Sequence, residues 1–136
     1  MTKLSGRCLC GDVTWRYDGP RGRNLICHCT SCQRAASSAY VAFVEVDPKQ
    51  VSWSGTPNHY QSSPGTFRGF CPTCGTRLYF RSDRWPGELH IHAATLDDAT
   101  LYQPDCQVVL RERAPWLDGI DALPRHDGFD TPPSDQ

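Results

Sequence analysis

The residues with the clearest chemistry are the cysteines, most of which fall into three short motifs. The chain holds eight cysteines in 136 residues, and the motifs are Cys8-Leu9-Cys10, Cys27-His28-Cys29 followed by Cys32, and Cys71-Pro72-Thr73-Cys74. The two close pairs give four thiols, which is the ligand number of a closed tetrahedral zinc site. The middle motif gives three, which leaves one coordination position for water or a substrate. The spacing therefore predicts a structural zinc beside a reactive one, a combination typical of an enzyme.

The first and last motifs have the local sequence of metal-binding turns. A glycine follows each pair, at Gly11 and Gly75, where the missing Cβ lets the backbone turn back under a metal. The alternative for Cys71 and Cys74 is a thioredoxin-like redox pair, which needs its first thiol at a helix N-terminus. The sequence after Cys74 has a strand pattern instead, and this favours a zinc held by Cys8, Cys10, Cys71 and Cys74.

The middle motif is the more informative one for function. Cys27 and Cys29 lie at an expected strand end, and Cys32 in the first turn of a short helix can reach the same point. A metal with a free position can polarise a carbonyl group or bind a substrate thiol as its thiolate. The alternative is a second closed site, completed by a fourth ligand from His28, His59 or Cys106. His28 is the weakest of these, because its side chain should point away between two flanking ligands.

Length and charge exclude several other classes of protein. A chain of 136 residues is expected to form one domain with a modest core. The formal net charge is −1, from 14 basic and 15 acidic residues mixed along the chain, so no nucleic-acid partner is indicated. No apolar run reaches the length of a signal peptide or the roughly 20 residues of a membrane span. We therefore expect a cytoplasmic protein with no membrane partner, whose thiols stay reduced and available to metals.

The segments between the motifs predict a mainly β domain. Apolar and polar residues alternate over residues 13–17, 51–53, 78–80 and 89–92, which is typical of half-buried strands. Residues 40–46 are more continuously apolar, with Glu45 as the one charged residue, and predict a strand covered on both faces.

Only one helix is expected, and it is short. It covers residues 30–36, with Thr30 or Ser31 as its N-cap. We predict a single zinc-binding domain over residues 1–120 and a partly mobile C-terminal tail over residues 121–136, where Asp, Gly and Pro accumulate.

Four segments together resemble a known family. They are Gly6-Arg7-Cys8-Leu9-Cys10-Gly11, Cys27-His28-Cys29-Thr30-Ser31-Cys32-Gln33-Arg34, Arg68-Gly69-Phe70-Cys71-Pro72-Thr73-Cys74-Gly75 and Ala94-Thr95-Leu96-Asp97-Asp98. In order and spacing they look like the successive motifs of the glutathione-dependent formaldehyde-activating enzymes, a family that includes the centromere protein V group. The resemblance runs from about Gly6 to Trp116.

The resemblance implies a fold, a reaction and a set of ligands. The fold would be the Mss-four-like arrangement of several small coiled antiparallel sheets, with one short helix and zinc as a staple. The reaction would be that of a carbon-sulfur lyase, adding glutathione to formaldehyde to give S-hydroxymethylglutathione. The structural zinc would be held by Cys8, Cys10, Cys71 and Cys74, and the catalytic zinc by Cys27, Cys29 and Cys32. Family members often carry glycine at the position of Ser37.

Other side chains are candidates for binding or proton transfer. Glutathione has two carboxylates, which guanidinium groups would hold. Arg34, two residues after Cys32, is the best placed of these, and the other possibilities are Arg68, Arg81 and Arg84. His90 and His92 share one face of a strand and could act as acid or base, although structural histidines are more common there.

Two functions of other classes fit the same cysteines. One is a zinc-stabilised binding module without turnover. Against it, the sequence shows neither the basic patch nor the long disordered arm expected for contact with chromatin or microtubules. The other is a redox or metal sensor whose three-cysteine cluster loses its metal on oxidation. The sequence does not indicate an oligomeric state.

Overall fold

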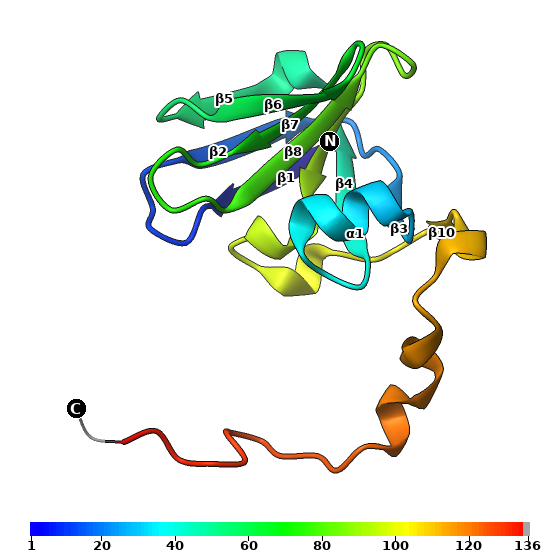
Figure 1. Ribbon diagram of the computed structural model, residues 1–136. Helices are drawn as coiled ribbons and strands as arrows, with labels where there is room; N and C mark the ends of the chain where they lie inside the picture. Colours follow the sequence, from blue (N-terminus) through cyan, green and yellow to red (C-terminus); the bar gives the residue numbers. More distant parts are fainter. Residues whose placement is uncertain (135–136) are drawn as a thin grey trace.

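The computed structural model describes residues 1–134, and it is a mainly β structure with one α-helix in that part of the chain (Figure 1). A three-stranded antiparallel sheet has the order β1 (Thr2–Arg7), β2 (Thr14–Gly19), β5 (Val51–Ser54). The strands over residues 13–17 and 51–53 are thus confirmed as β2 and β5. In β2 the side chains alternate between buried and outward-facing as predicted.

The second sheet has seven strands. Its order is β10 (Cys106–Val108), β3 (Asn24–Cys27), β4 (Val41–Val46), β9 (Leu89–His92), β8 (Arg77–Ser82), β7 (Thr66–Phe70), β6 (Asn58–Ser63). Every neighbouring pair is antiparallel except β10 with β3, which is parallel. The mainly β prediction is confirmed, and the sheets of the described residues number two.

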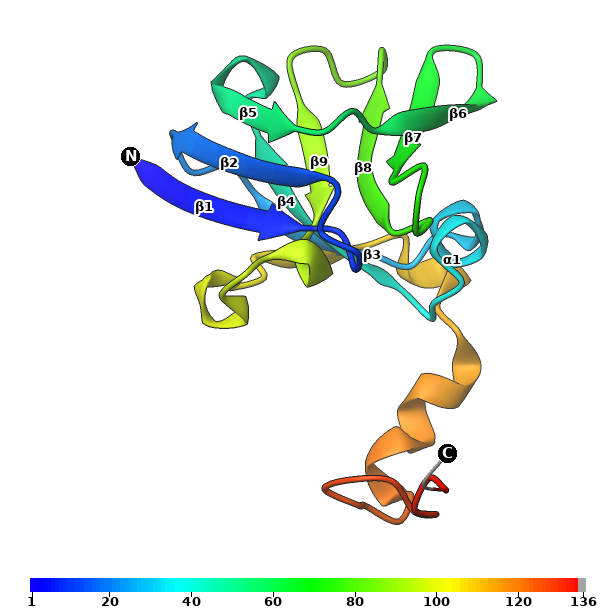
Figure 2. The ribbon, with the colours of Figure 1, turned by 90° about the vertical axis from the view of Figure 1, so that its left-hand side faces the viewer.

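The main core lies where the small sheet covers the middle of the large one (Figure 2). Trp15 and Tyr17 of β2 pack in one cluster with Val44 of β4 and Ile91 of β9. The indole Nε1 of Trp15 donates to the hydroxyl of Thr95 at 3.1 Å, so this buried donor is satisfied. The burial of these aromatic and branched side chains holds the two sheets together.

Strand β9 differs from its prediction. Residues 89–92 are predicted to be half-buried, but three of the four residues are buried. The reason is position, because β9 lies between β4 and β8 and the histidine face of the strand is covered as well. His90 meets Phe43 and Phe80 edge-on and pairs with Glu88 at 2.9 Å.

The short helix α1 (Thr30–Ala36) has the bounds that the sequence predicts. The predicted N-cap is wrong, however. The sequence predicts Thr30 or Ser31, and the structure has Cys29 in that place. The Cys29 Sγ accepts from the Cys32 N–H at 3.2 Å. The helix ends at Ser37 in the left-handed conformation, with φ of 52°. That conformation favours glycine, which explains why a glycine is expected at this position by resemblance.

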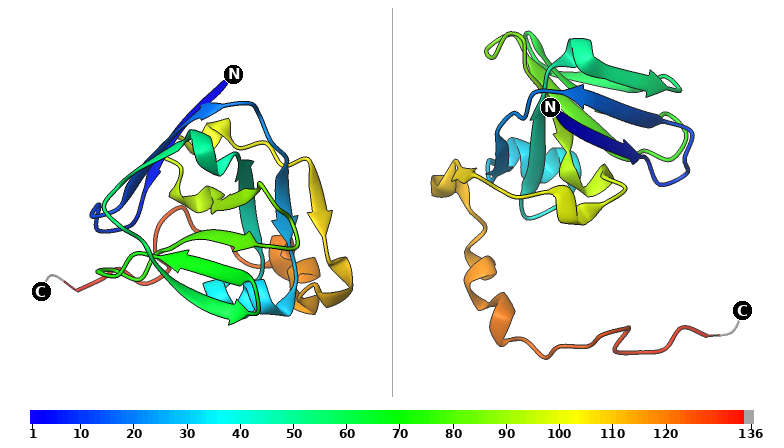
Figure 3. Two further views of the ribbon diagram at one scale, coloured as in Figure 1. Left: turned by 90° about the horizontal axis from the view of Figure 1, so that it is seen from above. Right: turned by 180° about the vertical axis from the view of Figure 1, so that it is seen from behind.

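The remaining helical segments are 3-10 turns, at η1 (Pro48–Gln50), η2 (Ala93–Thr95), η3 (Ala99–Leu101), η4 (Leu110–Glu112) and η5 (Pro115–Ala122). The chain after β10 runs away from the sheets, as Figures 1 and 3 show, and residues 121–134 are exposed. A domain boundary after residue 120 and a mobile tail stay predictions, and residues 135–136 of that tail lie outside the described residues. No helix within residues 1–134 is long and apolar enough to cross a membrane.

Candidate metal centres

The first and last cysteine motifs come together as one group, the four-cysteine cluster. It consists of Cys8, Cys10, Cys71 and Cys74, whose Sγ atoms all lie within 4.8 Å of one another. The Cys10 Sγ is 3.6 Å from the Cys8 Sγ and 3.8 Å from the Cys71 Sγ. Four sulfurs at about 2.3 Å from a tetrahedral zinc are about 3.8 Å apart, so the spacing fits zinc closely.

The backbone around the four-cysteine cluster forms two turns of the same kind. Gly11 and Gly75 have φ of +84° and +78°, which only glycine adopts without strain. In the second turn the Gly75 N–H donates to the Cys71 carbonyl at 2.9 Å. The backbone N–H of Cys74 also donates to the Cys71 Sγ, at 3.5 Å. The expectation that the two glycines shape these turns is therefore confirmed.

Thr76 connects the two turns, a role that sequence reasoning missed. Its hydroxyl accepts from the Leu9 N–H at 3.0 Å and lies 3.2 Å from the Cys74 Sγ. Hydrogen bonds from the Thr76 hydroxyl and N–H lower the pKa of the Cys74 thiol to about 5. The lowered pKa favours the thiolate, which is the metal-binding form.

The middle motif forms the second group, the three-cysteine cluster of Cys27, Cys29 and Cys32. Cys27 ends β3, Cys29 caps α1 and Cys32 lies in its first turn, and the three Sγ atoms are within 4.8 Å of one another. Cys27 and Cys32 are buried, and Cys29 is half-buried. This convergence is as the sequence predicts.

The thiols of the three-cysteine cluster differ in their pKa values. Hydrogen bonds from Cys27 and Cys32 lower the pKa of Cys29 to about 2, and the Cys32 N–H and the charge of Arg68 act in the same direction. The same interaction with Cys29 raises the pKa of Cys27, as does burial. Negative charge is therefore favoured first on Cys29, the least buried of the three residues.

Arg68 is the charged side chain that the structure brings to the three-cysteine cluster. It is buried, and its Nη1 donates to the Cys32 Sγ at 3.5 Å. Its Nε donates to the Ser62 hydroxyl at 3.2 Å, and the guanidinium lies 5.1 Å from the centre of the Phe80 ring. The sequence offered one signal for Arg68, its place three residues before Cys71 in the third motif.

The other arginine candidates do not reach this cluster. Arg34 lies exposed on α1. Arg81 stacks over Phe67 and Arg84 over Trp85, on the outer part of the large sheet and the turn that follows.

The three proposed fourth ligands also lie elsewhere. Among residues 1–134, the group of converging ligand atoms around Cys27 contains no member beyond the three cysteines. The His28 Nε2 lies 2.8 Å from the Gln107 side-chain oxygen on β10, as its predicted orientation away from a metal requires. His59 packs edge-on against Phe67, and Cys106 is exposed on β10.

His28 instead fixes the loop that carries the ligands. The backbone N–H of His28 donates to the Val108 carbonyl at 3.1 Å, and the backbone carbonyl of His28 accepts from the Gln33 side chain at 2.6 Å. The same Gln33 amide donates to the Glu112 carbonyl at 2.9 Å. The loop between β3 and α1 is thus tied to the segment around β10.

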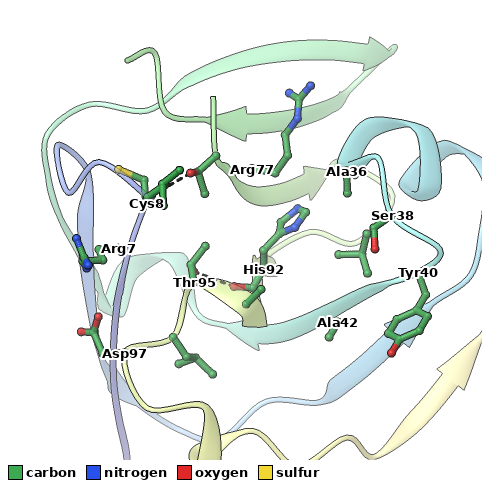
Figure 4. A pocket seen from close by; sticks show the side chains of 15 residues that line it. Arg7, Cys8, Ala36, Ser38, Tyr40, Ala42, Arg77, His92, Thr95 and Asp97 are labelled. Carbon is green, nitrogen blue, oxygen red and sulfur yellow. Dashed lines mark hydrogen bonds between the residues drawn. The ribbon is translucent and has the colours of Figure 1, made fainter. Parts of the chain in front are cut away.

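A cavity of about 580 Å³ is lined by Cys8 of the four-cysteine cluster and by Ala36, which packs against the apolar cluster that contains Cys27 and Cys32 (Figure 4). Arg7 and Cys8 line one end, Ser38 and Tyr40 line the other, and His92 lies between them. Its wall includes Val41, which pairs with Cys27 across β3 and β4 and packs in one apolar cluster with Cys27 and Cys32. Volumes of this order are typical of small-molecule sites.

The rim and floor of the cavity carry charged and titratable groups. Arg7, Arg77 and Asp97 line it, as Figure 4 shows. Burial, together with the charges of Arg68 and Arg77, lowers the pKa of His92 to about 4. His92 is therefore a neutral imidazole at neutral pH.

The fold and the site define a class of protein: a mainly β domain with one four-cysteine and one three-cysteine cluster, each able to bind a metal ion such as zinc. The model of the glutathione-dependent formaldehyde-activating enzyme family matches residues 3–112. The chain belongs to this family.

The chain is also similar to two other proteins. An uncharacterized lyase of Schizosaccharomyces pombe is 28% identical over 118 residues, which cover 87% of this chain and 86% of the relative. The crystal structure of a Rhodobacter sphaeroides protein is similar with a TM-score of 0.63 and 20% identity, covering 77% of this chain and all of that one. The likeness to the Rhodobacter sphaeroides structure concerns the fold. The Schizosaccharomyces pombe protein links the chain to a relative named as a lyase.

Proposed function

We propose that the protein is a zinc-dependent carbon-sulfur lyase that joins a glutathione-like thiol to a small carbonyl compound such as formaldehyde, or separates the two. The observation that carries the proposal is the three-cysteine cluster, with three converging thiols and no fourth ligand from residues 1–134. Zinc bound there would hold a thiol as its thiolate and polarise a carbonyl group. The four-cysteine cluster would hold a structural zinc.

The reaction is an addition whose atoms balance without an oxidant or reductant. The thiol sulfur forms a bond to the carbonyl carbon, the carbon-oxygen double bond becomes a single bond, and the thiol proton finishes on the oxygen. The reverse reaction breaks the same carbon-sulfur bond.

The residues of this chain have separate parts in that reaction. Cys27, Cys29 and Cys32 supply the ligands, and the loop anchored through His28 keeps them in place. The cavity beside Cys27 receives the thiol. The neutral His92 at the centre of the cavity can accept a proton there. Arg34 remains a candidate for holding a carboxylate of the thiol from the end of α1.

The test compares the original protein with two single cysteine variants in the formation of the adduct from ¹³C-formaldehyde and glutathione, followed by NMR. The zinc-loaded protein should accelerate the reaction above its spontaneous rate. Cys29→Ser should lose this acceleration and stay folded, whereas Cys106→Ser, which removes an exposed thiol outside both clusters, should keep it. Zinc content, measured by elemental analysis, should fall from two per chain to one in Cys29→Ser.

Two results would contradict the proposal. One is a zinc-loaded protein that leaves the spontaneous rate unchanged. The other is unfolding of Cys29→Ser, which would assign the three-cysteine cluster a structural role like the one proposed for the four-cysteine cluster.

A further inference from the structure

Arg68 is a buried cation that has no carboxylate partner within residues 1–134. Its exposed fraction is 9%, and among residues 1–134 no carboxylate oxygen lies within 4.0 Å of its guanidinium. Its contacts are the Cys32 Sγ, the Ser62 hydroxyl and the face of the Phe80 ring. A guanidinium stays charged in proteins, and a buried charge without a counter-charge is strongly destabilising. The neighbouring sulfurs are the anions that balance it.

We infer that Arg68 sets the charge of the three-cysteine cluster so that its metal accepts an anionic fourth ligand, a thiolate, in preference to a neutral one. A divalent metal and three thiolates carry a net charge of −1, which would repel a thiolate. The guanidinium brings that sum to zero, so that binding a thiolate leaves −1 instead of −2. The inference rests on the proposed function, because it assumes that this cluster binds a metal and that a thiol is its ligand.

The surroundings of Arg68 make this charge effective. Arg68 lies on β7, between β6 and β8. Its Nε donates to the Ser62 hydroxyl on β6, and its guanidinium lies over the Phe80 ring on β8. Because the side chain is buried, water screens its charge weakly. Because it is held on two sides, it does not swing out to solvent when the cluster changes its charge. A hydrogen bond to Cys32 also withdraws electron density from that sulfur.

The experiment measures ligand binding and not turnover. Cobalt(II) replaces zinc in the full-length protein, and its visible absorption reports a fourth ligand directly. Dissociation constants are measured for glutathione, an anionic ligand when bound, and for imidazole, a neutral one. Arg68→Met removes the charge and keeps an unbranched apolar stem like that of arginine, and Arg68→Lys keeps the charge. Arg81→Met is the matched control, because Arg81 also stacks over a ring but is exposed.

The expected result is a change in selectivity. Arg68→Met should bind glutathione roughly tenfold to a hundredfold more weakly, as expected for a unit charge a few ångströms from the ligand, while its affinity for imidazole changes less than threefold. Arg68→Lys and Arg81→Met should bind both ligands within about threefold of the original protein.

Three results would overturn the inference. They are unchanged glutathione binding in Arg68→Met, an equal loss for both ligands, and a folded Arg68→Lys variant that behaves like Arg68→Met. The proposed function fails separately, since a protein that binds thiolate selectively and yet does not accelerate adduct formation would refute the reaction and leave the role of Arg68 standing.

Discussion

Gly75 allows a quantitative test of how the four-cysteine cluster is held. Its φ of +78° lies in the left-handed region, and a Cβ added to it would meet no atom within 4 Å. Gly75→Ala therefore carries the backbone cost of that conformation alone, about 1 kcal/mol, with no steric clash. Gly87 is a matched control, because its φ is +81°, its added Cβ also meets nothing, and its turn between β8 and β9 belongs to neither cluster.

Both variants should lose the same stability, but only one should lose metal affinity. We expect each to lower the free energy of unfolding by about 1 kcal/mol, which is a fall in Tm of roughly 3 °C for a domain of this size. The Gly75 turn brings the Cys74 Sγ to the cluster, so Gly75→Ala should also bind zinc about fivefold more weakly. Competition with a chromophoric chelator measures this affinity in protein whose three-cysteine cluster is removed by Cys29→Ser. Equal zinc affinity in Gly75→Ala and Gly87→Ala would refute the reasoning.

Two further predictions concern the helix end and the cavity. Ser37→Gly relieves the left-handed strain at the end of α1 and should raise the free energy of unfolding by about 0.5–1 kcal/mol, measured by urea denaturation; a lower midpoint would contradict this. The lowered pKa of His92 means that the unfolded chain binds a proton that the folded chain does not, so the stability from this group is complete above pH 6.5 and lost as the pH falls toward 4. His92→Phe should reduce the dependence of urea midpoints on pH in that window, and an unchanged slope would show that His92 is not the group responsible.

The cysteine sites were predictable because their spacing is local. The two residues between Cys71 and Cys74 decide whether these thiols can meet one metal, so the local sequence is enough to predict the pair. The helix over residues 30–36 was predictable for a similar reason, although a cysteine cap was not, since thiols are uncommon caps. The pairing of the first motif with the third spans the chain, and it follows from counting ligands and not from any local pattern.

Other features depend on contacts that the sequence does not encode locally. The edge strand β6 is exposed at all six of its residues and has no apolar period that could predict it. The burial of β9 depends on its neighbours in the sheet. Arg68 reaches Cys32 across 36 positions, a contact that requires β7 and α1 to be placed first.

The parallel pairing of β10 with β3 has a consequence for the synthesis of the protein. A chain leaves the ribosome from its N-terminus, so all ligands of the four-cysteine cluster emerge before β10 does. The loop of Cys27 and Cys29 is anchored through His28 to Val108 and Gln107, which emerge later. During this interval the nascent chain presents its most reactive thiols without the strand that holds them. Zinc would thus meet a complete four-cysteine cluster first, and the three-cysteine cluster would mature last.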